Sequence, residues 1–198
     1  MVDIKSYQNW EALYRDVNVK ELPWYYKQLD HDMKNAIKSL NIRSGNILDL
    51  GTGPGTQAIQ LADLGLKVTA TDISESAISK ARKLSNKVKF LQDNILETEL
   101  PANSFDYIFD RGCLHTMHPS SRQLYIKNIN KILKKNGLLF LKTFSNLQPG
   151  NWGPYRFSQE NIIELFSHDF KIINIKHTTY KGTLEEEPKS LFIIMRKQ

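Results

Sequence analysis

The segment 47–58, ILDLGTGPGTQA, places a short apolar stretch directly before three glycines at alternate positions, and a helical pattern follows at once. Gly51, Gly53 and Gly55 lack a Cβ atom, so the backbone can turn tightly there and approach a bound molecule closely. A buried strand that turns through such a loop into a helix is typical of α/β sheets that bind nucleotides. The segment therefore predicts a ligand-binding turn at the carboxyl end of a strand.

The chain beyond this turn alternates between strand and helix patterns. Strands are predicted at 46–51, 67–72, 88–94, 105–110, 138–144, 170–180 and 189–197, and helices at 5–40, 56–65, 74–85, 120–137 and 158–167, with Thr56 and Ser74 as N-caps. This alternation predicts an α/β fold with a doubly wound parallel sheet. Only residues 181–188 join the last two strands, which is too short for a parallel crossover, so we expect that pair to be antiparallel.

Three acidic residues end successive predicted strands, at the edge where such sheets bind ligands. Asp49 lies two residues before the first glycine, where a carboxylate disfavours a pyrophosphate and favours an ammonium or sulfonium group. Asp72 follows Gly53 by 19 residues and suits ribose hydroxyls, and Asp93 suits the amino edge of an adenine. Each acid taken singly is equally explained as a turn residue, but the three together indicate one ligand site.

The motif DLGTGPG at 49–55, followed by Asp72 and Asp93, resembles the cofactor-binding half of class I S-adenosylmethionine-dependent methyltransferases. The resemblance covers residues 44–145 and, more loosely, the whole chain. It implies a seven-stranded Rossmann-like sheet in the order 3-2-1-4-5-7-6, with strand seven antiparallel, and S-adenosylmethionine as cofactor. It also implies one methyltransferase domain over 1–198, with an N-terminal helical lid at 1–43 and a Rossmann-like core at 44–198.

The same resemblance implies roles for residues around the cofactor. Gly51 and Gly53 would pass under its methionine part, and Asp49 would lie near its ammonium group. Asp72 would hold the ribose, and residues 93–95 would frame the adenine. The candidate cofactor-binding residues are Trp10, Asp49, Gly51, Thr52, Gly53, Gly55, Thr56, Asp72, Ile73, Asp93, Asn94, Ile95, Asp110 and Arg111.

The segment FDYIFDRGCLHTMHP at 105–119 bears on the methyl acceptor. It lacks the Asn/Asp-Pro-Pro-aromatic motif of some nucleobase amino methyltransferases, which disfavours a nucleobase nitrogen as acceptor. Arg111 and His115 are the candidate catalytic residues: Arg111 would orient an anionic acceptor, and His115 would accept a proton or stabilise a thiolate. In the alternative interpretation, Arg111 pairs with Asp106 or Asp110, and His115 caps the following helix.

Two aromatic segments are candidates for covering the acceptor. Trp152, Tyr155 and Arg156 lie in the Gly/Pro-rich loop 145–158, where burial is less forced, and we expect them to contact substrate. The N-terminal pattern NWEALY…ELPWYY supplies Tyr14 and Trp24, which join His115 as further candidate substrate residues. This opening is similar to that of thiopurine, thiol and tellurite-resistance methyltransferases, and it implies a soft nucleophile such as sulfur as the methyl acceptor.

Composition bounds the compartment and the partners. Cys113 is the only cysteine, so no intramolecular disulfide can form, and we expect a reducing, cytoplasmic location. No run of 18 apolar residues and no signal-peptide core is present, so no membrane segment is expected. The net charge of +6 comes from scattered lysines without a nucleic-acid motif, which favours a solvated lysine-rich surface over a nucleic-acid partner. The two aromatic segments that can cover the acceptor favour a small molecule. His115 and His118 have no second ligand pair, so no metal is expected.

The sequence thus predicts an S-adenosylmethionine-dependent methyltransferase that acts on a small molecule, with a thiol or other soft nucleophile as the candidate acceptor. Two alternatives stay open: a regulatory protein that binds the cofactor without turnover, and a methyltransferase with a protein or RNA acceptor. An NAD-dependent oxidoreductase is disfavoured by Asp49 and by the absence of a suitable Tyr-x-x-x-Lys pair. The oligomeric state has no signature in the sequence.

Overall fold

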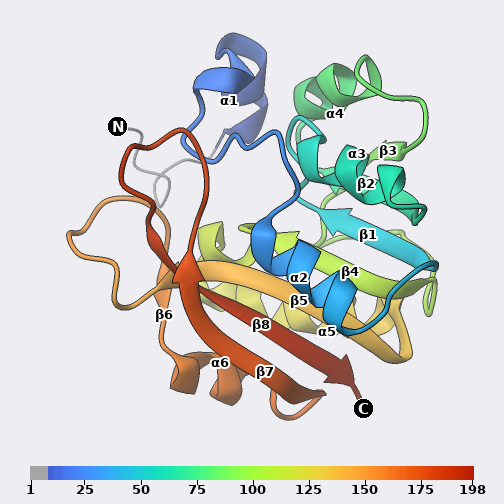
Figure 1. The fold of residues 1–198 in the computed structure, drawn as a ribbon, viewed down its shortest axis with the longest axis vertical. Helices are drawn as coiled ribbons and strands as arrows, with labels where there is room; N and C mark the ends of the chain where they lie inside the picture. Colours follow the sequence, from blue (N-terminus) through green and yellow to red (C-terminus); the bar gives the residue numbers. More distant parts are fainter. Residues whose placement is uncertain (1–8) are drawn as a thin grey trace.

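The computed structural model describes residues 9–198, so part of the predicted lid, residues 1–8, lies outside it (Figure 1). Its helices are α1 Trp10–Asp16, α2 His31–Ser39, α3 Thr56–Asp63, α4 Glu75–Arg82, α5 Arg122–Ile132 and α6 Gln159–Phe166, with short 3-10 turns at Val19–Glu21, Leu114–Thr116 and Pro119–Ser121. Its strands are β1 Asn46–Leu50, β2 Lys67–Asp72, β3 Lys89–Gln92, β4 Phe105–Arg111, β5 Leu133–Ser145, β6 Arg156–Phe157, β7 Phe170–Thr179 and β8 Lys189–Lys197.

Within residues 9–198, eight strands form one sheet in the order β3-β2-β1-β4-β5-β8-β7, and the short β6 pairs with the end of β5. Strands β1 to β5 run parallel, whereas β8 is antiparallel to both β5 and β7. Because β7 and β8 are the predicted sixth and seventh strands, this order confirms the predicted Rossmann-like sheet. The two-residue β6 was not predicted from the sequence.

Two apolar layers hold the helices on opposite faces of the sheet. Side chains of α2, α3 and α4 pack on one face with Ile47 and Phe109, and those of α5 and α6 pack on the other with Leu48 and Ile108. Successive residues of β1 therefore enter different layers, as the two-residue period of a strand requires. Figure 1 shows α2 crossing in front of the sheet and α5 behind it.

Local predictions were confirmed for some helix ends and wrong for others. Ser74 caps α4 as predicted, since its side chain accepts from the Ala77 amide. Thr56 is the first residue of α3 rather than its cap, because Gly55 takes the capping position with a left-handed φ of 79°. The predicted helix 120–137 ends at Ile132, because the chain becomes extended at Leu133 and pairs there with β4.

Two segments distant in sequence meet beyond the carboxyl ends of the strands. The region predicted as one helical stretch at 5–40 is divided into α1, a 3-10 turn and α2, with an irregular stretch between the last two. The β7–β8 connection, residues 180–188, rises from the edge of the sheet toward this stretch (Figure 1). The Thr183 amide donates to the Pro23 carbonyl at 3.1 Å, so the two segments are in direct contact.

Among the described helices, none combines the length and the apolar character needed to cross a membrane.

Candidate active site

The carboxyl ends of the parallel strands open into a cavity of about 290 Å³. Its lining comes from the loops after β1, β2, β3, β4 and β5, from the stretch between α1 and α2, and from the β7–β8 connection. Ligands bind at this edge in open α/β sheets because neighbouring loops diverge there and leave a crevice. The cavity lies where the sequence analysis placed the site.

Asp49 is the penultimate residue of β1 and is almost fully buried beside the glycine turn. It accepts a hydrogen bond of 2.5 Å from the Thr52 hydroxyl. Burial raises the pKa of Asp49 to about 7, although the Thr52 hydrogen bond and the charge of Arg111 act in the opposite direction. Because a nearby cation would favour the ionised carboxylate, this end of the cavity suits a positively charged group.

Asp72 joins the end of β2 to the glycine turn. Its Oδ2 accepts from the Gly53 amide at 2.8 Å, and its Oδ1 accepts from the Ser74 amide at 3.0 Å. Burial raises the pKa of Asp72 to about 6. Each carboxylate oxygen can accept more than one hydrogen bond, so Asp72 retains capacity for hydroxyl donors in the cavity.

Asp93 presents an unsatisfied acceptor after β3. Its Oδ1 accepts from the Thr98 hydroxyl at 3.0 Å, whereas its buried Oδ2 has no hydrogen-bond partner among the described residues. Burial raises the pKa of Asp93 above its usual range. A buried polar atom without a partner is costly, so a ligand amino group that donates to Oδ2 would be stabilised there.

Most of the predicted cofactor residues gather at the cavity. Its lining includes Trp10, Asp49, Gly51, Thr52, Gly53, Thr56, Asp72, Ile73, Asp93, Asn94, Ile95 and Arg111. Gly51 and Gly53 have φ values of 68° and 53°, and a Cβ on Gly53 would lie 2.6 Å from the Tyr14 hydroxyl. The turn therefore requires glycine at both positions.

Two predicted cofactor residues, Gly55 and Asp110, do not line the cavity. A Cβ on Gly55 would lie 2.8 Å from the Phe90 ring, so this glycine permits close packing of α3 rather than contact with a ligand. Asp110 directs its carboxylate to three amides in the turn after β4 and to the Tyr125 hydroxyl at 2.6 Å. It orders that turn from within the protein.

The other half of the cavity is apolar and aromatic. We call two of its segments the acceptor wall: Pro23, Trp24 and Tyr25 ahead of α2, and Tyr180, Leu184 and Pro188 of the β7–β8 connection. Phe144 and Trp152 lie beside them and contact each other edge to face, with ring centroids 6.1 Å apart. Predicted substrate residues Tyr14, Trp24, His115 and Trp152 all line the cavity.

His115 is buried at the cavity as a neutral imidazole. Its Nδ1 accepts from the Phe144 amide at 3.1 Å, which leaves the proton on Nε2. Burial and the charge of Arg111 lower its pKa to about 3. The alternative interpretation as a helix cap is wrong for His115, since His118 caps that turn by accepting from the Ser120 amide. The predicted role as proton acceptor is also disfavoured, because Nε2 is left as a donor.

Arg111 is nearly buried, with only 6% of its side chain exposed. Its Nε donates to Asp30 at 3.1 Å, and its two terminal nitrogens donate to the carbonyls of Trp24 and Lys181. The alternative interpretation foresaw a carboxylate partner, but that partner is neither Asp106 nor Asp110. The prediction that Arg111 binds an anionic acceptor is not supported by these contacts, which occupy the guanidinium within the protein.

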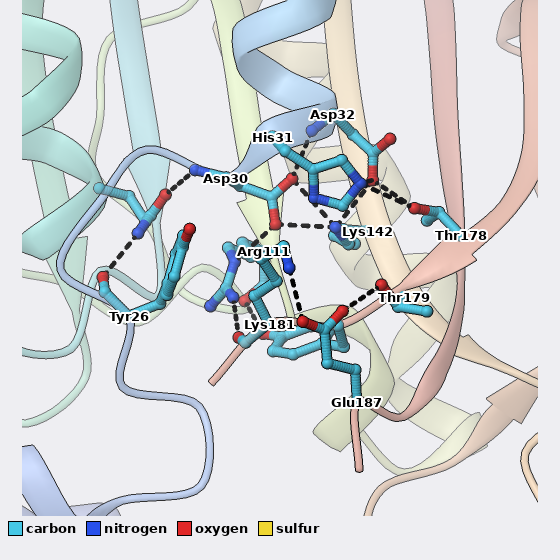
Figure 2. Close-up of polar contacts among 12 residues, drawn as sticks. Tyr26, Asp30, His31, Asp32, Arg111, Lys142, Thr178, Thr179, Lys181 and Glu187 are labelled. Atoms are coloured by element: carbon cyan, nitrogen blue, oxygen red, sulfur yellow. Dashed lines mark hydrogen bonds and ion pairs between the residues drawn. The ribbon is translucent and has the colours of Figure 1, made fainter. Parts of the chain in front are cut away.

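Figure 2 shows the ionic cluster behind Arg111, which the sequence analysis missed. Lys142 Nζ contacts both oxygens of Asp30 and lies 2.8 Å from Asp32, and all three side chains are fully or almost fully buried. Burial would raise the pKa of Asp32, but the charge of Lys142 and hydrogen bonds from Lys142, Lys176 and Thr178 lower it to about 2. The lowered pKa keeps Asp32 ionised.

This cluster also bears on metal binding. Within the described residues, the group with the spacing to hold a metal ion is Asp30, His31 and Asp32. The ammonium of Lys142 contacts both carboxylates and so supplies their positive charge. A side-chain cation therefore balances the charge of these carboxylates.

Tyr155 and Arg156, two predicted substrate residues, are not among the lining residues. The Tyr155 ring lies under the guanidinium of Arg122, whose Cζ is 4.9 Å from the ring centroid. Arg156 donates to the carbonyls of Pro149, Gly150 and Trp152. It folds the loop that carries Trp152, so its contribution to the cavity is indirect.

Comparison with known proteins agrees with this geometry. Residues 47–137 match the model of a methyltransferase domain family. An uncharacterised methyltransferase of Schizosaccharomyces pombe is 31% identical over 134 residues, which cover 66% of this chain and 92% of that protein. The chain belongs to the class I methyltransferases. S-adenosylmethionine is the cofactor of this family, and the donor-seeking carboxylates Asp49, Asp72 and Asp93 fit its ammonium, hydroxyl and amino groups.

Two further similarities extend over more of the chain. Thiocyanate methyltransferase 1 of Brassica oleracea is 26% identical over 178 residues, which cover 86% of this methyltransferase and 77% of that protein. A structure solved in work on the conversion of a disulfide bond into a thioacetal group during echinomycin biosynthesis matches with a TM-score of 0.82 at 21% identity. That match covers 95% of this chain and 91% of the other, and it shows a shared fold.

Several residues that shape the site escaped the sequence analysis. Gln57 fastens the stretch ahead of α2: its side chain donates to the carbonyls of Tyr26 and Gln28 and accepts from the Asp30 amide. Lys142 had one available signal, because a lysine within the apolar strand pattern LLFLKTF requires a buried carboxylate partner. Its partner Asp30 had no comparable signal.

Proposed function

We propose that this protein transfers a methyl group from S-adenosylmethionine to the sulfur atom of a small, largely apolar molecule. The observation that carries the proposal is that one cavity is lined both by three carboxylates and by an aromatic wall. The carboxylates of the first half can accept hydrogen bonds and attract positive charge. The cofactor has hydroxyl and amino donors and a charged ammonium group. The second half suits a flat or apolar acceptor.

The residues of the first half would bind and orient the cofactor. Asp49 would lie near its ammonium group, Asp72 would accept from ribose hydroxyls, and the free Oδ2 of Asp93 would accept from the adenine amino group. Thr56 lines the cavity at the start of α3, where the amino end of a helix favours the cofactor's carboxylate. The bound cofactor supplies an electrophilic methyl group on a sulfonium.

The residues of the second half would exclude water and hold the acceptor. Phe144, Trp152 and Tyr180 provide apolar surface, and His115 offers its Nε2–H as a neutral donor. A neutral N–H donor of this kind can form a hydrogen bond to a thiolate and stabilise it. His115 is too weak a base, with a pKa of about 3, to remove a proton from the acceptor near neutral pH.

Two observations favour sulfur as the acceptor atom: the apolar lining of the acceptor wall and the similarity to a thiocyanate methyltransferase. The acceptor wall suits an apolar body, and a thiolate needs no strong base because thiols ionise near neutral pH. The similarity to a thiocyanate methyltransferase favours the same kind of soft nucleophile. The N-terminal pattern that contains Trp24 favours the same kind of acceptor.

The experiment uses purified protein, methyl-labelled S-adenosylmethionine, and benzenethiol, thiocyanate, aniline and benzoate as separate acceptors. We expect label in the methyl thioether of benzenethiol and none in the amine or ester product. The matched control is Asp49→Asn, which removes the carboxylate from the cofactor half and should abolish labelling. Turnover of aniline or benzoate without any thiol turnover would overturn the proposal.

A second arm separates the other functions. The same labelled cofactor is added to a cell extract fractionated by size, and calorimetry compares S-adenosylhomocysteine with NAD. Label in the small-molecule fraction supports the proposal, and label on protein or RNA contradicts it. Binding of S-adenosylhomocysteine without any labelling would indicate a regulatory protein.

We further propose that residues 1–198 form one methyltransferase domain in which residues 1–43 cover the core at 44–198. The contacts of Gln57 and Arg111 with the stretch ahead of α2 support this arrangement. We also propose a reducing, cytoplasmic location, because Cys113 has no cysteine partner in the chain.

A further inference from the structure

The acceptor wall consists of two segments that have no covalent connection near the site. One is the stretch ahead of α2 with Trp24, and the other is the β7–β8 connection with Tyr180. Both lie beyond the ends of the strands, so the sheet itself does not fix their separation. The distance between them determines the width of the acceptor half of the cavity.

The two segments meet along a narrow seam. The Thr183 amide and hydroxyl donate to the carbonyls of Pro23 and Leu22, each at 3.1 Å. A Cβ on Gly182 would lie 1.8 Å from the Pro23 carbonyl oxygen, so the backbones are in contact there. The seam is therefore made almost entirely of backbone groups, which have little preference for one register over another.

Arg111 connects both sides of this seam to the sheet. One terminal nitrogen donates to the Trp24 carbonyl at 3.2 Å, and the other donates to the Lys181 carbonyl. Figure 2 shows the guanidinium between Asp30 and Lys181. The Tyr180 ring lies 4.3 Å from the Arg111 Cζ, and the Tyr180 hydroxyl donates to the Arg111 carbonyl at 2.7 Å.

Asp30 fixes the direction of the guanidinium. It accepts from Arg111 Nε, and Lys142 contacts both of its oxygens. Because Lys142 belongs to β5 and Arg111 to the end of β4, the group that orients Arg111 is tied to the sheet. A planar guanidinium held at Nε points its two terminal nitrogens in fixed directions.

We propose that Arg111 is a positioning residue that sets the width of the acceptor half of the cavity by holding both segments of the acceptor wall to the end of β4. Its guanidinium acts on the acceptor only through the positions of Trp24 and Tyr180. This inference rests on the proposed function for the identity of the acceptor. The contacts of Arg111 with the two segments do not depend on that function. A lysine at this position would keep the positive charge beside Asp30 but could not direct two further donors to two separated carbonyls.

The test compares Arg111→Lys with the unaltered protein by hydrogen–deuterium exchange, calorimetry and kinetics. We expect the Thr183 amide, which donates to the Pro23 carbonyl, to exchange at least about tenfold faster, because opening the seam becomes easier by about 1.4 kcal/mol. The affinity for S-adenosylhomocysteine should change less than about threefold. With benzenethiol as acceptor, KM should rise about 10- to 100-fold, since displaced walls orient the acceptor poorly.

Two further variants keep the test interpretable. Arg82→Lys is the same substitution at a half-exposed arginine on α4 that pairs with Glu75. None of the three measurements should change in this variant. Thr183→Val removes the hydroxyl that bonds Leu22, away from the residues lining the cavity, and it should reproduce the faster exchange and raised KM in weaker form.

Unchanged exchange of the Thr183 amide in Arg111→Lys would overturn the proposal, whatever the activity of the protein. An equal loss of S-adenosylhomocysteine and benzenethiol binding would overturn it as well, because it would indicate direct contact of Arg111 with the cofactor. If the Thr183 amide exchanges faster in Arg111→Lys but the unaltered protein methylates no thiol, the positioning role of Arg111 is supported and the proposed function is wrong.

Discussion

Lys142 and Asp30 form a fully buried ion pair in which one ammonium contacts both carboxylate oxygens, at 3.0 and 2.8 Å. The same ammonium also contacts Asp32, so one cation on β5 serves two carboxylates at the start of α2. The pair joins the sheet to the segment that covers it. Its removal would leave two buried negative charges with fewer partners.

We expect Lys142→Met to lower the free energy of unfolding by about 3–5 kcal/mol, because breaking the buried pair leaves its carboxylates charged without this cation. Urea unfolding followed by circular dichroism measures the change. The control is Lys87→Met, which breaks an exposed pair with Asp63 and should cost less than about 1 kcal/mol. A similar, small cost for both variants would contradict the structural role of the pair.

The raised pKa of Asp49 predicts a pH dependence of stability in the ligand-free protein. Its pKa is about 7 in the folded protein and lower in the unfolded chain, so the folded state retains a proton that the unfolded state loses. The contribution of Asp49 is therefore fully present below about pH 4 and is lost as the pH rises to about 7. It amounts to about 4 kcal/mol for a shift of this size.

Asp49→Asn should remove this part of the slope between pH 4 and 7. Urea unfolding of both proteins at half-unit intervals measures the difference. The affinity of the unaltered protein for S-adenosylhomocysteine should also rise toward pH 7, because its ammonium group favours the ionised carboxylate. Parallel stability curves for the two proteins would show that Asp49 does not titrate in this range.

His115 should leave no mark on the pH profile of turnover. Its pKa of about 3 lies far below the range from pH 5 to 8, so at saturating S-adenosylmethionine the profile of kcat/KM with benzenethiol should follow the ionisation of the thiol, without a contribution from His115. His115→Leu should lower kcat/KM by about 10- to 100-fold through loss of one charge-assisted hydrogen bond. His115→Gln, which retains an N–H donor, should restore part of the loss. A break near pH 6.5 that disappears in His115→Gln would establish a general base instead.

Trp152 should affect the acceptor without affecting the cofactor. Its ring packs edge to face on Phe144 at the acceptor half, so Trp152→Ala should raise the KM for benzenethiol about 5- to 10-fold. The affinity for S-adenosylhomocysteine should stay within about twofold. Leu147→Ala, an exposed change in the same loop, is the control and should alter neither quantity. A weakened S-adenosylhomocysteine affinity in Trp152→Ala would place this side chain in the cofactor half.

The cofactor half could be predicted because its residues follow from local patterns. Asp49, Asp72 and Asp93 each lie within one residue of a strand's end, and parallel strands bring such ends to one edge without any knowledge of packing. Gly55 and Asp110 were also predicted to bind the cofactor, but Gly55 lies against Phe90 and Ala81, and the Asp110 carboxylate accepts from Tyr125 on α5. Strand ends therefore gave the neighbourhood of each residue but not its orientation.

The acceptor half was harder to predict because its residues come from segments far apart in the chain. Trp152, Tyr155 and Arg156 have equal claims within one loop, yet only Trp152 lines the cavity, since backbone contacts of Arg156 fold the loop around it. Arg111 was expected near the ligand and lines the cavity, but its partners Asp30 and Lys181 are 81 and 70 residues away. No spacing rule connects such positions.

The separation of 112 positions between Asp30 and Lys142 also bears on the order in which a growing chain can acquire its site. Asp30 leaves the ribosome first and stays in water until β5 has been made, about 6–22 s later at usual rates of synthesis. During that interval α2 lacks the cation that anchors its amino end. A chain that stops before Lys142 would carry the glycine turn and all three carboxylates, but it would lack both this cation and the β7–β8 segment of the acceptor wall.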